Sequence, residues 1–233
     1  MSEAILRRLG RLHPRAIDMS LARVERLLGA CGSPECRLPP VTIFAGTNGK
    51  GSTLAMVRAG LEASGASVHA YTSPHLVRFA ERIVVGGREI DESALTDLLA
   101  EVEAINAAEP ITFFEATTCA ALLAFSRAGA DHTLVEVGMG GGMDATNPRG
   151  LAPRLCVITP IGLDHVDFLG DTVEEIAEHK GGILRPNVPA IVAPQVYLPR
   201  PYLAPHGHTM LLQVLSVPSV ICRSRERRSA CSN

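Results

Sequence analysis

Short apolar runs alternate with longer, helically patterned segments over the first 195 residues of the chain. Runs of apolar and β-branched residues predict strands, here at Val41–Phe44, Val68–Tyr71, Leu134–Val137, Leu155–Thr159 and Ala190–Ala193. Apolar residues at helical spacing predict helices, here at Ser52–Ser64, Glu92–Asn106, Glu115–Ala128 and Val173–Ile183. This alternation predicts an α/β fold with a mostly parallel sheet and helices on both of its faces.

Two local signals refine this plan. Ile83–Val85 and Arg88–Ile90 flank Gly86-Gly87, a pattern typical of a small β-hairpin. Asp91 precedes the helix predicted from Glu92 and is a suitable N-cap residue. Ligands of open parallel sheets bind beyond the carboxyl ends of the strands, so the polar residues that follow each predicted strand are the candidates for function.

The first strand runs directly into the glycine-rich segment Gly46–Ser52, GTNGKGS. Glycines let the backbone approach an oxyanion, the following helix N-terminus attracts it, and Lys50 adds a positive charge. Gly51 separates Lys50 from Ser52, so the segment is a variant of the usual phosphate loop. The alternative is a strand-to-helix turn without a ligand; the apolar strand before the loop and Ser52-Thr53 after it favour ATP or GTP.

Candidate ligands for a cation follow the second and third strands. The Ser73 hydroxyl can ligate Mg²⁺, and His75 or Arg82 can meet an anion, although this stretch by itself is more typical of a simple turn. Glu136 lies at the tip of an apolar strand, where a carboxylate is costly unless it is paired or bound to a metal. We favour an Mg²⁺ ligand over a core salt bridge at Glu136.

Two further groups lie later in the chain. His165 follows Asp164 after the fourth strand and is either a second metal ligand or an ordinary loop histidine. Lys180 follows Glu174, Glu175 and Glu178 in a predicted helix, and from its position alone it is a surface lysine.

Composition restricts the class of protein. The 233 residues are 46% hydrophobic and 20% charged with a net charge of −2, which predicts one globular domain and no nucleic-acid partner. No leader-like or membrane-length apolar segment is present, so we expect a cytoplasmic protein without a membrane partner. The six cysteines have no zinc-site spacing and are expected to be reduced, with Cys119 and Cys156 in the core.

The segment 196–233 differs from the rest, because prolines interrupt it and four arginines lie close together near its end. We interpret residues 1–195 as an ATP-binding domain and 196–233 as a Pro- and Arg-rich tail that is not a second domain.

Six motifs occur in a characteristic order: GTNGKGS at 46–52, TSPHLVRFAERI at 72–83, TFFEATT at 112–118, EVGMGG with MDATN within 136–147, ITPIGLDHVDFLG at 158–170 and HKGGIL at 179–184. The ordered set resembles the folylpolyglutamate synthase and dihydrofolate synthase branch of the Mur ligase superfamily. The resemblance implies a P-loop NTPase-like central domain of a monomeric, ATP-dependent ligase. Such a ligase joins L-glutamate to dihydropteroate or to folylpolyglutamate through an acyl phosphate, with Mg²⁺.

The resemblance also implies roles for individual residues. The ATP contacts would be Asn48, Gly49, Lys50, Gly51 and Ser52. The Mg²⁺ ligands would be Ser73, Glu136 and His165, and the catalytic group would be Lys50, Glu136, His165 and Lys180, the last at the position that is carbamylated in the family. The substrate contacts would be Asp18, Met19, Ser20, Thr112, Phe113, Phe114, Glu115, Met143, Asp144 and Ala145.

Three features depart from the family pattern. Gly142 stands where the family usually has arginine, and His179–Gly182 reads HKGG in place of glutamate-lysine-alanine-glycine. The family pattern also continues past Gln195 into the rest of the ATPase domain and a C-terminal domain. We therefore expect a truncated chain that binds ATP weakly at best and has no ligase turnover. The alternatives are a non-catalytic fragment that binds nucleotide or pterin, and another Mur-type amino-acid ligase.

Overall fold

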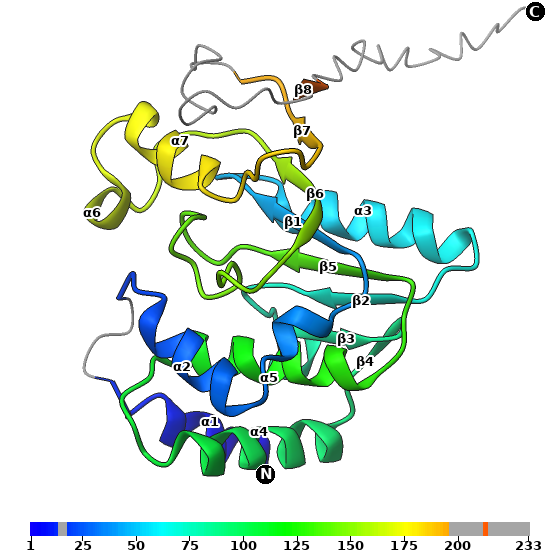
Figure 1. Cartoon of the computed structure of the whole chain (residues 1–233), viewed down its shortest axis with the longest axis vertical. Helices are drawn as coiled ribbons and strands as arrows, with labels where there is room; N and C mark the ends of the chain where they lie inside the picture. The colour runs from blue at the N-terminus through cyan, green and yellow to red at the C-terminus, as the bar shows by residue number, and fades with distance from the viewer. Residues whose placement is uncertain (14–17, 196–211, 214–233) are drawn as a thin grey trace, which may run out of the picture.

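The computed structural model describes residues 1–13, 18–195 and 212–213. In this part of the chain one eight-stranded sheet has the order β4-β3-β2-β5-β1-β6-β7-β8 (Figure 1). The strands are β1 (Val41–Ala45), β2 (Val68–Tyr71), β3 (Ile83–Val85), β4 (Arg88–Glu89), β5 (His132–Glu136), β6 (Pro153–Ile158), β7 (Ala190–Val192) and β8 (Leu212–Gln213). The six strands from β2 to β8 in this order are parallel, and β3 and β4 add an antiparallel edge. The predicted mostly parallel sheet is confirmed.

Seven α-helices accompany the sheet in the described residues: α1 (Ser2–Leu9), α2 (Ala22–Ala30), α3 (Lys50–Ala63), α4 (Glu92–Asn106), α5 (Phe113–Arg127), α6 (Val166–Leu169) and α7 (Val173–Gly181). The bounds of α4 are those predicted, and the Asp91 carboxylate caps this helix by accepting the Ala94 N–H at 2.8 Å. The hairpin around Gly86-Gly87 is also confirmed, although β4 ends at Glu89.

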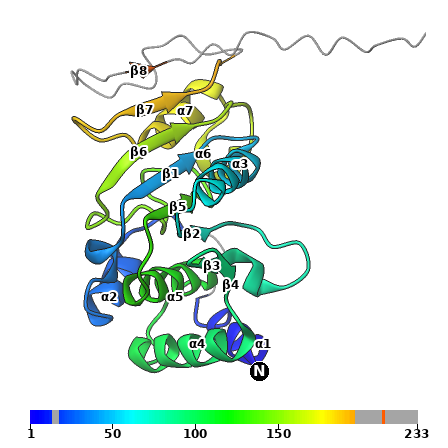
Figure 2. The same ribbon diagram turned by 90° about the vertical axis from the view of Figure 1, so that its right-hand side faces the viewer.

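Alternating strand residues build two apolar layers on opposite faces of the sheet. On one face, Leu54 of α3 packs with Phe44, Ala70 and Leu134. On the other face, Ile43 and the neighbouring inward-facing strand residues join a larger core with α1, α2, α4, α5 and α7. Figure 2 shows α3 apart from the α2 and α5 layer. Helices therefore cover both faces, as the sequence predicts.

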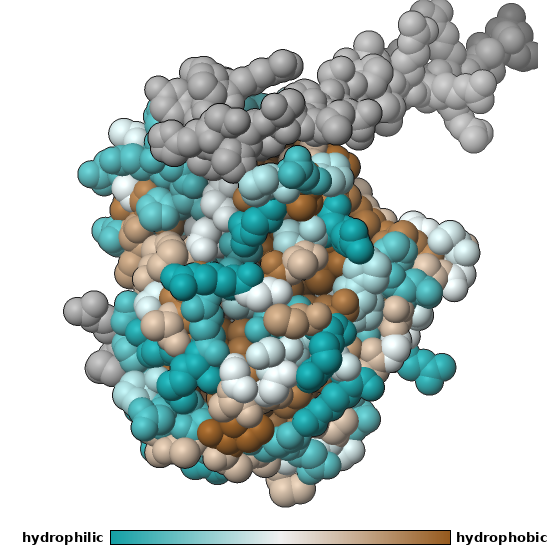
Figure 3. All heavy atoms as spheres, in the orientation of Figure 1, coloured by the Kyte–Doolittle hydropathy of each residue, from teal (hydrophilic) through white to brown (hydrophobic). Residues whose placement is uncertain are grey.

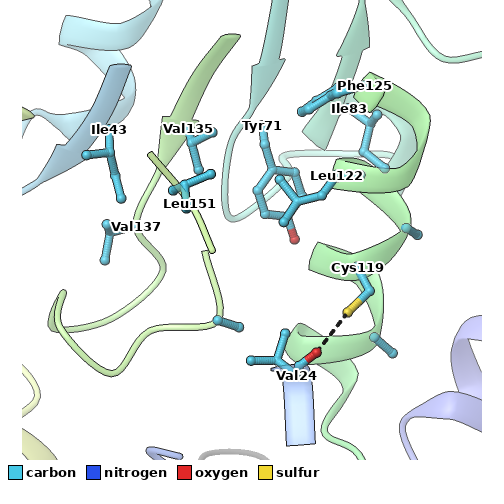
Figure 4. Packing of buried hydrophobic residues seen from close by; sticks show 14 of the residues in the cluster. Val24, Ile43, Tyr71, Ile83, Cys119, Leu122, Phe125, Val135, Val137 and Leu151 are labelled. Atoms are coloured by element: carbon cyan, nitrogen blue, oxygen red, sulfur yellow. Dashed lines mark hydrogen bonds between the residues drawn. The ribbon is translucent and has the colours of Figure 1, made fainter. Parts of the chain in front are cut away.

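Helix α5 lies against the sheet through an almost fully buried surface. Tyr71 of β2 reaches from the sheet to this helix, where its hydroxyl is 3.2 Å from Thr118 Oγ1 (Figure 4). The Cys119 thiol is buried 3.9 Å from the Val24 carbonyl of α2. Cys156 of β6 is also fully buried, so both predicted core cysteines are confirmed as small core residues.

Three helices were missed by the sequence prediction. In α1 the buried residues Ile5, Leu6 and Leu9 form a short apolar stripe between arginines, and α2 presents a similar stripe. These helices are short, and their burial depends on α4 and α5, which pack against them from distant parts of the chain. The third, α6, has only four residues.

Several predicted bounds also shift. α3 begins two residues earlier than predicted, at Lys50, and its N-cap residue Gly49 has a positive φ of +83°, which glycine adopts without strain. α5 begins at Phe113 because Thr112 and Glu115 form a capping box, and α7 ends at Gly181. Of the tail predicted over 196–233, only Leu212–Gln213 lie within the described residues, and they pair in parallel with β7. The rest of that prediction lies outside them.

No helix in the described segments is long and apolar enough to cross a bilayer. Figure 3 shows polar and apolar side chains interspersed over the face seen in Figure 1.

Candidate active site

The glycine-rich loop between β1 and α3 is held against the segment that follows β6. Gly46 has φ +145°, and a Cβ atom there would lie 1.9 Å from Thr159 Oγ1. The N–H groups of Thr47 and Asn48 both donate to the Pro160 carbonyl, at 3.0 and 3.3 Å. Gly46 is therefore required by close packing, and the loop is anchored to a neighbouring strand end before any ligand binds.

Lys50 and Lys180 converge on this loop. Lys50 Nζ donates to the carbonyls of Gly46 at 3.0 Å and Thr47 at 3.3 Å, and Lys180 Nζ donates to Gly46 O at 3.0 Å. Lys180 is only 2% exposed, so its interpretation as a surface lysine is wrong. Burial, and secondarily the charge of Lys50, lower the pKa of Lys180 to about 8.

Glu136 ends β5 directly beside Phe44, the penultimate residue of β1. Its side chain is 5% exposed, and it accepts the Ser73 N–H at 3.1 Å and the Gly51 N–H. Burial raises the pKa of this carboxyl group. A Cβ at Gly51 would lie 3.4 Å from the Glu136 carboxylate, so the extra glycine of the loop gives this carboxylate room.

A cavity of about 400 Å³ opens beside these residues. Lys50, Ser73 and His165 line its wall. The wall also contains most of the predicted substrate residues, namely Asp18, Met19, Ser20, Thr112, Phe114, Glu115, Met143, Asp144 and Ala145. Glu136 and Gly51 line an adjacent hollow that shares Ser73 and Pro74 with the cavity. Asn48, Gly49 and Ser52 lie on the loop and first turn next to Lys50. The structure therefore brings predicted substrate, metal and phosphate groups to one edge of the sheet.

Phe113 and Phe114 diverge at the start of α5. Phe114 lines the cavity, and a Cβ at Gly138 would lie 2.4 Å from its ring. The ring of Phe113 instead meets Phe79 edge to face at 5.8 Å and lines a separate hollow. Consecutive helix residues point about 100° apart, so only Phe114 of the two predicted aromatic residues lies in the cavity wall.

An arginine that the sequence prediction missed organises one side of the cavity. Arg23 of α2 donates through Nε and Nη2 to both oxygens of Glu115, at 3.0 and 2.8 Å, and through Nη1 to Asp18 at 3.1 Å. Glu115 also accepts the Thr112 N–H at 2.8 Å. No sequence signal marks Arg23, because its role depends on two carboxylates that are 5 and 92 residues away.

The loop after β5 is folded around Asp144. This buried carboxylate accepts the Met139 N–H at 2.8 Å and the Thr146 N–H at 3.0 Å. Burial raises the pKa of Asp144. Gly142, the position that departs from the family pattern, packs against the end of α7, where a Cβ would lie 3.2 Å from Gly182 Cα.

His165 stands at the mouth of the cavity. It has φ +51°, caps the start of α6, and places Nε2 3.6 Å from the Asp164 carboxylate. Its side chain is 42% exposed, so the imidazole is accessible from solvent. Among the described residues no group of three or more His, Cys, Asp or Glu side chains is placed to hold a metal ion. An Mg²⁺ set of Ser73, Glu136 and His165 would therefore use one carboxylate with a hydroxyl and an imidazole.

A parallel α/β sheet with a lysine-centred glycine loop and a buried carboxylate on the adjacent strand tip defines a nucleotide-binding domain of the phosphate-loop type. Residues 44–193 match the Mur ligase middle domain, and the chain belongs to this family.

Several relatives belong to one branch of that family. The dihydrofolate synthase/folylpolyglutamate synthase of Escherichia coli strain K12 is 43% identical over 184 residues, covering 79% of this chain and 43% of that protein. The folylpolyglutamate synthase of Lacticaseibacillus casei is 37% identical over 176 residues, covering 72% of this chain and 40% of that protein. The chain thus spans about two fifths of the length of these relatives.

Solved structures agree with the sequence comparison. E. coli FolC in complex with DHPP and ADP superposes with a TM-score of 0.77 at 42% identity, covering 82% of this chain and 45% of that one. A bifunctional folylpolyglutamate synthase/dihydrofolate synthase with Mn, AMPPNP and L-glutamate bound also gives 0.77 at 36% identity, covering 86% and 48%.

Proposed function

We propose that this chain is the ATP-binding part of a ligase that joins L-glutamate to dihydropteroate, to folylpolyglutamate, or to both. The convergence of the phosphate-loop lysine, Ser73, His165 and the predicted pterin contacts on one cavity carries this proposal. The names and bound ligands of the relatives support the same substrates. The reaction would pass through an acyl phosphate on the pterin-linked carboxylate, which the glutamate amine then attacks.

The loop 48–52 would hold the ATP phosphates. Asn48 and Gly49 are exposed at the tip of the loop, and Lys50 opens α3, so the first helical turn faces the same space. The free N–H groups of a helix N-terminus stabilise negative charge. Lys50 would exchange its contacts with the Gly46 and Thr47 carbonyls for phosphate oxygens, because its amine already lies beside the loop.

Ser73, Glu136 and His165 would hold Mg²⁺. The Glu136 carboxylate is buried and accepts two N–H groups, and among the described residues it forms no ion pair, although the charge of Lys50 acts on it. This arrangement fits a group that binds a cation. When bound, Mg²⁺ neutralises charge on the phosphoryl group during its transfer. The two N–H donors fix the carboxylate orientation in advance.

Phe114 would stack on the flat pterin ring, and the Asp144 loop with Met143 and Ala145 would border it. Asp18 and Glu115, held by Arg23, would offer fixed acceptors to ring N–H groups. Phe113 would support the site through its contact with Phe79.

Lys180 would be carbamylated. A lysine with a pKa of about 8 is partly neutral near pH 7.5, and only the neutral amine can react with CO₂. The carbamate would replace a buried ammonium by a carboxylate-like group next to the phosphate loop.

The remaining expectations belong to the same proposal. Residues 1–195 would form the Mur-ligase-type domain, and 196–233 would be a tail that is not a second domain, although its residues Leu212–Gln213 pair with β7. The protein would act as a cytoplasmic monomer on small molecules, without nucleic-acid or membrane partners.

The experiment is to measure binding of ADP with Mg²⁺ and of pteroate to the full chain, together with glutamate-dependent ADP release. We expect both ligands to bind, the nucleotide weakly, and Lys50→Ala to abolish nucleotide binding. Gly129→Ala, at an exposed glycine where a Cβ would meet nothing within 4 Å, should retain it. Binding without ADP release identifies the non-catalytic fragment. ADP binding without pteroate binding identifies another Mur-type ligase and contradicts the folate proposal.

A further inference from the structure

Arg82 is a buried cation in the wall of the cavity that no residue of the predicted site uses. It ends the short 3-10 helix Phe79–Arg82, is 9% exposed, and lines the cavity beside Ser73 and Phe114. Within residues 1–13 and 18–195 no carboxylate lies within ion-pair distance of its guanidinium. A buried charge without a partner costs free energy, so a ligand is the natural partner.

The carboxylates of the cavity wall are already engaged. Asp18 and Glu115 pair with Arg23. Asp144 is fully buried and accepts N–H groups of its own loop. Each of these carboxylates would therefore have to break an existing hydrogen bond or ion pair before it could pair with Arg82. Apart from Lys50 of the phosphate loop, Arg82 is the cation of the described cavity wall that has no anionic acceptor.

Two neighbours fix the orientation of this guanidinium. Nε of Arg82 donates to Nδ1 of His75 at 2.8 Å, and the guanidinium carbon lies 5.2 Å from the centre of the Phe79 ring. The Phe79 ring covers one face of the cation. The Nε edge is occupied by His75, so the two terminal nitrogens, Nη1 and Nη2, are the ones left for a ligand.

We propose that Arg82 binds the carboxylate of the pterin-linked acid through its two terminal nitrogens, and that His75 is a positioning residue that holds the guanidinium for this contact. The inference rests on the proposed function, because it assumes that the cavity takes a pterin-linked acid. The planar guanidinium of arginine can donate two parallel hydrogen bonds to the two oxygens of a carboxylate, and a lysine ammonium group cannot. The same contact would hold the carboxylate oxygens near the phosphate loop.

The first experiment needs no variant. Pteroate and pteroate methyl ester share the ring system and differ in the charge of the carboxyl group. Isothermal titration of each into the full chain should show at least a tenfold preference for the acid. Equal affinities for the acid and the ester overturn the role of Arg82 but leave the proposed function standing. Failure of both compounds to bind overturns the proposed function and this inference together.

The variants assign the preference to a residue. Arg82→Gln should lower the affinity for pteroate to that for the ester and leave the ester affinity unchanged, and Arg82→Lys should retain only part of the preference. The matched control is Arg88→Gln, an exposed arginine on the adjacent hairpin, which should keep the full preference. Unchanged ester binding reports that the variant cavity is folded.

His75 is tested by the same ratio of affinities. His75→Ala should reduce the preference for the acid, and His75→Gln, which keeps a hydrogen-bond acceptor, should restore part of it. A loss of acid and ester binding by the same factor in both variants would indicate a merely structural role and overturn the positioning assignment.

Two other outcomes overturn the proposal. If Lys50→Met and not Arg82→Gln removes the preference, the loop lysine is the carboxylate partner. If Arg82→Gln weakens ADP binding and leaves the preference intact, Arg82 serves the nucleotide phosphates.

Discussion

The ammonium groups of Lys50 and Lys180 both donate to the carbonyl oxygen of Gly46, each at 3.0 Å. One lysine belongs to the phosphate loop and the other to α7, 130 positions later in the sequence. The shared acceptor brings two cations together where the chain turns from β1 into α3. Their mutual repulsion adds to the effect of burial in lowering the pKa of Lys180.

Replacement of Lys180 by Met should stabilise the protein at neutral pH. The pKa of Lys180 falls from 10.5 to about 8 on folding, so the unfolded chain binds more protons between these values and the stability of the wild type rises with pH. Lys180→Met should be more stable by up to about 3 kcal/mol at pH 7, and the difference should shrink from pH 8 to 10.5.

Urea unfolding at several pH values in CO₂-free buffer measures this difference. A gap between Lys180→Met and wild type that stays constant from pH 7 to 10 would contradict a neutralised lysine at position 180.

Glu136→Gln should separate metal binding from folding. The amide keeps an oxygen for the Ser73 and Gly51 N–H groups and removes a buried charge whose pKa is raised by burial. The ligand-free melting temperature at pH 7 should therefore not fall. The additional stabilisation that Mg²⁺ gives in the presence of ADP should be lost in thermal denaturation, because the only carboxylate of the proposed ligand set is gone.

Glu178→Gln, an exposed substitution on α7, is the control and should keep the Mg²⁺ effect. An Mg²⁺ titration of Glu136→Gln that matches wild type would rule out Glu136 as a ligand.

Gly138→Ala should disturb the cavity through the Phe114 ring. The added Cβ would lie 2.4 Å from that ring, so the ring must move, at a cost of about 1–3 kcal/mol in stability. Pteroate affinity should fall about tenfold or more, measured by titration. Gly129→Ala, where a Cβ would meet nothing within 4 Å, should change neither quantity. Normal pteroate affinity in Gly138→Ala would show that Phe114 does not contact the ligand.

His69 should make stability depend on pH in mildly acidic solution. It is fully buried, stacks on Phe125, lies 3.1 Å from the Ala128 carbonyl through Nε2, and accepts the Gly86 N–H at 3.0 Å through Nδ1. Burial lowers the pKa of His69 below 6.5. Its contribution is present above pH 6.5 and is lost as pH falls below that value, because the unfolded chain binds the proton first.

Urea unfolding between pH 5 and 8 measures this loss. His69→Gln keeps a donor and an acceptor but cannot titrate, so its stability should fall less steeply below pH 6.5. The same acid slope in this variant and in wild type would assign the slope to other groups.

The sequence pattern predicted the strands and helices whose formation is marked by residues close together in the sequence. The apolar run before Gly46 predicts β1, and the Asp91 cap with its helical repeat predicts α4 to the residue. The ordered motifs brought Lys50, Ser73, His165 and the Asp144 loop into one predicted site, because the carboxyl ends of parallel strands meet at one edge of a sheet. Helices α1 and α2 escaped prediction, since their short stripes are buried only by partners far along the chain.

The sequence by itself determined the order of the central strands and of the four long helices between and after them, the glycine loop and the family of the chain, since these depend on residues that are neighbours in sequence. Only the tertiary structure decided that Lys180 is buried against Gly46, that Phe113 points away from the cavity while Phe114 lines it, and that Arg82 lacks an anionic partner. Burial and charge pairing are set by groups that folding brings together from distant positions, and these set the chemistry of each side chain.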